Sequence, residues 1–306
     1  MLHENSDHIP VLLITVLDTL KIKSGDSILD CTLGLGGHSK AMIEAAGESG
    51  TLTALDADLR NMAVAKERLA AFSSRIRFIH TNFLHLPDCL GAEQATFDVI
   101  FADLGLSSPH IDLADRGFTF RSNAPLDMRY DHTQGFTAAD VLMKYNEEDL
   151  RLVFQNYGEL PKTHRFVTAI LEAREEKPLR TADDLNAIID TLYNRDAKKV
   201  TAQIYQALRI EVNSEMLAVE QLLSVGPKLL KPGGRMAILT YHSLEDRLVK
   251  QAFKALCTPE KDDYTGAVKV PANFSLLTRH AIKPTDEEIE NNPRARSAHL
   301  RAILRL

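Results

Sequence analysis

The stretch SILDCTLGLGGHS, residues 27–39, decides how this chain folds. A short apolar run is followed by three glycines, Gly34, Gly36 and Gly37, and then by a helix-like segment from His38. This order predicts a strand, a tight loop and a helix N-terminus, because glycine lets the backbone approach a ligand and the first helical N–H groups are free to bind it. A glycine turn without a ligand fits these residues too, so the nucleotide-binding interpretation depends on the residues downstream.

Apolar runs alternate with helix-like segments through the first third of the chain. The expected strands cover residues 27–30, 51–55, 75–80 and 97–102, with helices from residue 38 and over residues 61–71. Strands that alternate with helices at this spacing predict a parallel sheet with right-handed crossovers.

A helical block then interrupts the alternation, since residues 112–212 contain no convincing buried strand. Helical patterns cover residues 146–157, 162–176, 181–193 and 201–209. Thr181 followed by Asp184 resembles a capping box. We therefore expect an α/β core, residues 1–111 and 213–306, with an all-helical insertion at 112–212; one larger domain is the alternative.

The α/β pattern returns after the insertion. An amphipathic helix over residues 213–230 should stop at Lys-Pro-Gly-Gly, residues 231–234, because proline and paired glycines disfavour a helix. A strand over 235–241 and a helix over 244–256 come next. We expect closing strands at 275–280 and 298–306, and the second of these fits a helix as well.

Composition narrows the class of protein. The 306 residues are 44% hydrophobic and 25% charged, as in ordinary globular proteins. The sequence contains no run of 18 apolar residues, so it predicts no membrane span. The N-terminus lacks a basic segment before its short apolar run, which argues against a signal peptide and for a cytoplasmic protein. Cys31, Cys89 and Cys257 fit neither a disulfide framework nor a CxxC metal site, so we expect no metal.

Acidic residues end two of the expected strands. Asp56 follows the second strand and Asp103 the fourth, at the edge of the sheet where α/β proteins bind ligands. Asp56 could accept both ribose hydroxyls of a nucleoside. The nicotinamide fingerprint fits poorly because its third glycine position is Ser39. Carboxylates suit a positively charged sulfonium, and Lys-Pro-Gly-Gly before a late strand is typical of S-adenosyl-L-methionine enzymes.

Ten stretches along the chain form a recognisable set: HIPVLL (8–13), DCTLGLGGHS (30–39), DLGLSSP (103–109), RGFTF (116–120), PLDMR (125–129), NYGE (156–159), QALRIEVN (206–213), LKPGGR (230–235), HSLEDR (242–247) and NPRARS (292–297). In these stretches the chain resembles the bacterial RsmH/MraW family along almost its whole length. The resemblance implies a class I S-adenosyl-L-methionine-dependent methyltransferase, a Rossmann-like sheet with an inserted helical domain. It also implies N4-methylation of a cytidine in the decoding region of 16S rRNA, within the small ribosomal subunit.

The resemblance also implies a cofactor site. Its residues here are Gly34, Gly36, Gly37, His38, Asp56, Phe83, Asp103 and His110. Phe83 would pack against the adenine, although an ordinary core phenylalanine is the alternative. His110 stands where the family usually has glutamine, which leaves that contact in doubt.

The amine to be methylated is a poor nucleophile, because its lone pair is delocalised into the cytosine ring. Asp103 and the adjoining loop with Ser107 and Ser108 could hold it in line with the methyl group. His242 is a second catalytic candidate, for base contact or proton acceptance, and a structural histidine is the alternative. The sequence does not decide which group takes the proton.

RNA contact requires cations although the net charge is −6. Arg294 and Arg296 are the strongest expected contacts, in a C-terminal stretch that also holds Arg301 and Arg305 and no acid from residue 291 on. Lys198, Lys199 and Arg209 form a looser set, and solvated surface is the alternative for both. Asp127 and Arg129 could hold the nucleotide or form a structural pair.

We therefore predict direct methyl transfer to rRNA without a metal. Three rivals stay open: an RNA-binding assembly factor without turnover, a methyltransferase for DNA or a small molecule, and a nicotinamide oxidoreductase. The missing Pro-Pro-aromatic loop weakens the DNA version. The sequence leaves the oligomeric state open, a homodimer included.

Overall fold

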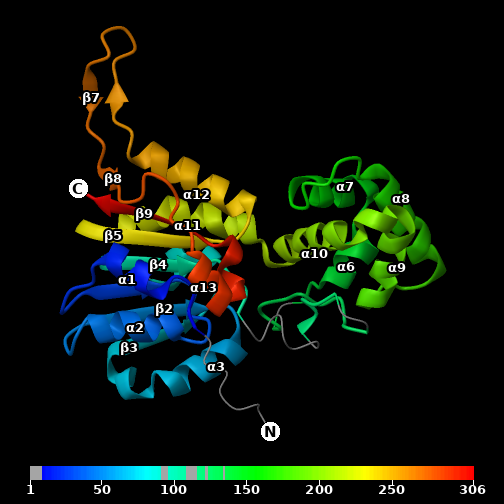
Figure 1. Cartoon of the computed structure of the whole chain (residues 1–306), viewed down its shortest axis with the longest axis horizontal. Helices are drawn as coiled ribbons and strands as arrows, with labels where there is room; N and C mark the ends of the chain where they lie inside the picture. Colours follow the sequence, from blue (N-terminus) through cyan, green and yellow to red (C-terminus); the bar gives the residue numbers. More distant parts are fainter. Residues whose placement is uncertain (1–8, 91–95, 108–115, 121–122, 134) are drawn as a thin grey trace. The chain divides into compact units, whose positions relative to one another are not determined.

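The computed structural model describes residues 9–90, 96–107, 116–120, 123–133 and 135–306. The chain divides into two compact units (Figure 1). The first, called the core, comprises Met1–Gly105 and Leu217–Leu306. The second, called the helical unit, comprises Leu106–Met216.

A seven-stranded sheet forms the core. Its strands are β1 (Ser27–Asp30), β2 (Thr51–Asp56), β3 (Ile76–His80), β4 (Phe97–Asp103), β5 (Leu230–Thr240), β8 (Phe274–Leu276) and β9 (His299–Arg305). The order is β3-β2-β1-β4-β5-β9-β8, in which β9 alone runs antiparallel to its neighbours. The chain reverses its direction of winding between β1 and β4, which creates a crevice at the carboxyl ends of these strands. The predicted class I Rossmann-like fold is confirmed.

Helices bury both faces of this sheet. They are α1 (Leu13–Leu20), α2 (Gly37–Ala45), α3 (Leu59–Arg68), α4 (Leu86–Cys89), α11 (Glu215–Leu229) and α12 (Ser243–Leu256). A further short helix, α13 (Asp286–Asn291), has no buried residue. Ile28 and Phe101 pack in one apolar cluster with residues of α1, α2 and α3, whereas Leu29 and Ile100 pack in another with residues of α11 and α12. Burial on both faces explains why these strands read as continuous apolar runs.

Several details differ from the sequence prediction or were missing from it. The strand expected at 275–280 is β8, which ends at Leu276. Lys-Pro-Gly-Gly lies inside β5, where the pairing with β4 shifts register between Leu230 and Arg235. The ambiguous last segment is a strand, β9, because it pairs with both β5 and β8. Helix α1 and a two-stranded hairpin, β6 (Glu260–Lys261) with β7 (Val268–Val270), were not predicted.

The helical unit has an apolar core of its own. Its helices are α6 (Ala138–Lys144), α7 (Glu147–Asn156), α8 (His164–Glu176), α9 (Ala182–Tyr193) and α10 (Ala197–Asn213). The rings of Phe154 and Phe166 pack edge to face in this core, with their centroids 4.9 Å apart. Thr181 and Asp184 form the predicted capping box at the start of α9. Among its described residues, this unit contains helices and no strand. In the described part of the whole chain, no helix has the length and apolar character to span a membrane.

Candidate functional site

Three carboxylates gather at the carboxyl edge of the sheet. Asp30, Asp56 and Asp103 are the last residues of β1, β2 and β4. These strands are neighbours, and Asp30 pairs in register with Ala54 of β2 and Phe101 of β4. The three side chains therefore flank the crevice at the switch point, as the sequence predicted for Asp56 and Asp103.

The glycine loop is packed so closely that side chains would not fit. A Cβ on Gly37 would lie 2.6 Å from Cγ of Pro10, and a Cβ on Gly36 would lie 3.2 Å from Cβ of Ala65 in α3. Gly34 and Gly36 also have positive φ angles of 53° and 78°, which glycine adopts readily. Glycine at positions 36 and 37 therefore allows the loop to pack against α3 and Pro10.

Asp56 ties this loop to β2. Its Oδ2 accepts a hydrogen bond from the Gly34 amide at 2.6 Å and its Oδ1 accepts one from the Asp58 amide at 2.7 Å. Burial nevertheless raises the pKa of Asp56 to about 7. A carboxylate has about four acceptor positions, so each oxygen can accept a further hydrogen bond from a ligand hydroxyl.

Asp30 holds the two ends of the loop together. Its Oδ2 accepts a 2.6 Å hydrogen bond from the Ser39 hydroxyl, and its Oδ1 accepts a 3.0 Å bond from the Thr32 amide. The side chain is fully buried, and this burial raises its pKa. Ser39 stands where the nicotinamide fingerprint has a glycine, and its hydroxyl has a structural role because it binds Asp30.

Asp103 accepts a backbone hydrogen bond at the end of β4. The Gly105 amide donates to its Oδ1 at 3.0 Å, and the Tyr241 side chain lies beside the carboxylate. The Nδ1 atom of His38 lies 3.8 Å from its Oδ2. Burial and the neighbouring Asp103 raise the pKa of Tyr241 well above its usual value. Tyr241 was missed by sequence reasoning, because nothing in its local sequence relates it to a residue on another strand.

Phe83 and His242 both contact other residues of the core. Phe83 begins the short helix after β3, is half-buried, and packs against the core. His242 precedes α12, and its Nε2 lies 3.1 Å from Oε1 of the buried Glu245. Glu245 also accepts a 2.9 Å hydrogen bond from the Tyr241 amide. A contact of Phe83 with adenine and a catalytic role of His242 stay predictions.

The loop after β4 is described only in part. Ser107 is half-buried, whereas Ser108 and His110 lie outside the described residues. The predicted roles of all three stay predictions.

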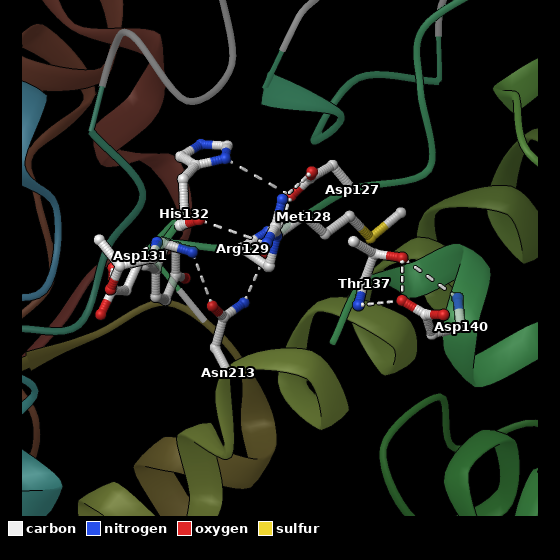
Figure 2. A network of polar contacts seen from close by, with 10 residues as sticks. Asp127, Met128, Arg129, Asp131, His132, Thr137, Asp140 and Asn213 are labelled. Carbon is white, nitrogen blue, oxygen red and sulfur yellow. Dashed lines mark hydrogen bonds and ion pairs between the residues drawn. The ribbon is translucent and has the colours of Figure 1, made fainter. Parts of the chain in front are cut away.

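Asp127 and Arg129 bind each other within the helical unit (Figure 2). The Nε and Nη2 atoms of Arg129 donate to Oδ1 and Oδ2 of Asp127 at 2.9 and 2.7 Å. Met128 between them has a φ of 62°, unusual for a bulky residue, and the Asn213 amide of α10 donates to its carbonyl at 2.7 Å. The geometry is that of a structural pair, although Asp127 also lines a hollow of about 520 Å³.

Two of the basic residues expected to contact RNA form ion pairs with acids of the chain instead. Arg301 makes a bidentate ion pair with Asp246, at 2.7 and 2.9 Å, and Arg209 makes another with Glu215, at 2.8 and 2.9 Å. The expectation that the C-terminal arginines lack a compensating acid is therefore wrong for Arg301. Arg296 is exposed and Arg294 half-buried.

Comparison with known proteins places the chain among methylases. The model of the MraW methylase family matches residues 5–306. Ribosomal RNA small subunit methyltransferase H of Parabacteroides distasonis is 42% identical over 299 residues, and that of Phocaeicola vulgatus is 41% identical over 300; each alignment covers 96% of both chains. The protein of the same name from Clostridioides difficile is 38% identical over 303 residues, covering 96% of this chain and 97% of its own. With the strand-end acids, the glycine loop and a match along nearly its full length, this chain belongs to the MraW methylase family.

Proposed function

We propose that this protein transfers a methyl group from S-adenosyl-L-methionine to the exocyclic N4 of a cytidine in small-subunit (16S) rRNA. The observation that carries the proposal is the crevice of Asp56, Asp103 and the glycine loop, in a chain aligned end to end with relatives named for that rRNA. The cytidine and its N4 rest on the family resemblance.

The residues at the crevice fit this cofactor, which supplies an electrophilic methyl group on a positively charged sulfonium. The free acceptor positions of Asp56 suit ribose hydroxyls, and the glycine loop lies beside this carboxylate through the Gly34 amide. Carboxylates near a cation are electrostatically favourable. Phe83 would cover the adenine.

Asp103 would orient the target amine. Its carboxylate is held by the Gly105 amide and has acceptor positions left, so it can accept an N–H of the cytosine amine and direct the nitrogen lone pair at the methyl group. Ser107 and Ser108 would contact the base. The cytosine must be unpaired or drawn out of its stack to reach this position.

The helical unit and two arginines before β9 would recognise the RNA. Arg294 and Arg296 lie in a short helix before β9, outside the buried part of the sheet, and are the cations we assign to phosphates. The small ribosomal subunit would be the substrate, which places the enzyme in the cytoplasm with ribosomes.

A methylation assay tests the proposal. Small subunits from cells that lack this protein are incubated with it and methyl-labelled cofactor, and the rRNA is digested for mass spectrometry. We expect one additional methyl group on the N4 of a cytidine. RNA binding without any labelled product would support the assembly-factor alternative, and a labelled nucleoside other than cytidine would refute the assigned target.

A further inference from the structure

We infer that His38 is the proton-holding partner of Asp103: its Nδ1 atom receives, through Asp103, the proton that the target amine loses. The inference rests on the proposed function, and deepens it by assigning the proton acceptor that the sequence left open.

The hydrogen bonds of the ring determine its tautomer. Nε2 of His38 lies 2.9 Å from the carbonyl oxygen of Val11, and a carbonyl only accepts hydrogen bonds. Nε2 therefore carries the hydrogen. In the neutral ring, the lone pair is then on Nδ1, the atom that faces Oδ2 of Asp103 at 3.8 Å. A basic nitrogen thus points at the carboxylate that would bind the substrate amine.

The ring is held rigidly in that orientation. The His38 side chain is only 10% exposed, and its ring lies 4.8 Å from that of Phe101. The segment that supplies the Val11 carbonyl is itself fixed, because the Leu12 amide donates to Oε1 of Glu288 at 2.5 Å. Little freedom remains for the ring to turn its Nδ1 away from Asp103.

Two acids face the ring, Asp103 of β4 and Asp30 of β1. Tyr241, which follows β5, lies beside Asp103, and Glu288 of α13 binds the N-terminal segment. Within the described part of the chain, no lysine or arginine pairs with Asp103. His38 is therefore the base that faces it.

Atoms and electrons balance in this transfer. The lone pair of the exocyclic nitrogen forms the new N–C bond, and the C–S bond breaks with its electron pair going to sulfur. The N–H proton passes to Oδ2 of Asp103 and then to Nδ1 of His38, which becomes a cation and later releases the proton to solvent. A shift of about 1 Å brings Nδ1 and Oδ2 from 3.8 Å into hydrogen-bond range.

His38→Gln isolates this role. The glutamine amide can still donate to the Val11 carbonyl, but it places no basic atom beside Asp103. At saturating S-adenosyl-L-methionine, we expect a kcat lowered by about 100-fold and loss of the rise of kcat with pH near neutrality that a histidine base confers. His80→Gln is the matched control, because Nε2 of His80 also bonds a backbone carbonyl, that of Ala57, at 2.9 Å. It should behave as the wild type.

A His38→Gln enzyme with wild-type kcat and pH profile would overturn the inference and leave His38 as a tether of the N-terminal segment. If that variant does not fold, nitrogen NMR of the wild-type protein decides: the neutral ring must carry its hydrogen on Nε2, and a hydrogen on Nδ1 overturns the inference. A wild-type protein that methylates no rRNA refutes the proposed function instead, so the two failures can be told apart.

Discussion

Replacing Asp56 with alanine should weaken cofactor binding without unfolding the protein. In the structure each carboxylate oxygen accepts one backbone amide, from Gly34 and Asp58, and has an acceptor position left for the ribose. Losing a charge-assisted hydrogen-bond partner costs about 1.5–3 kcal/mol, which corresponds to an affinity about 10- to 150-fold lower. Calorimetric titration with S-adenosylhomocysteine measures this, with circular dichroism to verify folding.

Asp98→Ala is the matched control for this experiment. Asp98 also lies on a strand of the same sheet and accepts a backbone amide, from Ser27 at 2.9 Å, together with the Lys231 ammonium at 2.7 Å. It lies near the start of β4, whereas the cofactor site is placed at the carboxyl ends of the strands. Asp98→Ala should lower stability and leave affinity intact. Equal affinity of folded Asp56→Ala and wild type would refute the assignment of Asp56 to the ribose.

The remaining predictions concern pH, the insertion and the arginines. Burial raises the pKa of Asp56 to about 7, and ribose hydroxyls need the ionised carboxylate. Affinity for S-adenosylhomocysteine should therefore rise between pH 6 and 8, and Asp56→Asn should flatten this rise. An unchanged pH dependence in Asp56→Asn would contradict the assignment. A short linker in place of residues 112–212 should preserve cofactor binding and abolish methylation, so a folded variant that still methylates small subunits would show that the helical unit is dispensable. Replacing Arg294 and Arg296 with glutamine should weaken RNA binding and reduce its log–log salt slope by about one unit per phosphate contact, without changing cofactor affinity. If the double variant has the salt dependence of the wild type, both arginines are solvated surface residues without phosphate contacts.

The sequence by itself determined the fold class and the positions of the acids at the strand ends. Buried parallel strands are continuous apolar runs, and their crossovers contain helices, so local patterns were enough to place β1 to β4. The glycine loop and the acids at Asp56 and Asp103 were recognisable because loop conformation and strand ends depend on neighbouring residues. The Thr181–Asp184 cap could be predicted for the same reason, since both partners lie within one helical turn.

Only the tertiary structure decided which groups act on one another. Arg301 counted as an unpaired cation until β9 brought it to Asp246, 55 residues earlier in the chain. The ring of His38 gained its tautomer and its orientation from Val11 and Asp103, and Tyr241 became part of the site through β5, which lies beside β4. Hydrogen bonds and charges depend on distance in space, and strands that are neighbours in a crossover sheet are remote in sequence. For that reason the acids at the strand ends could be recognised from the chain alone, whereas the groups that act on them could not.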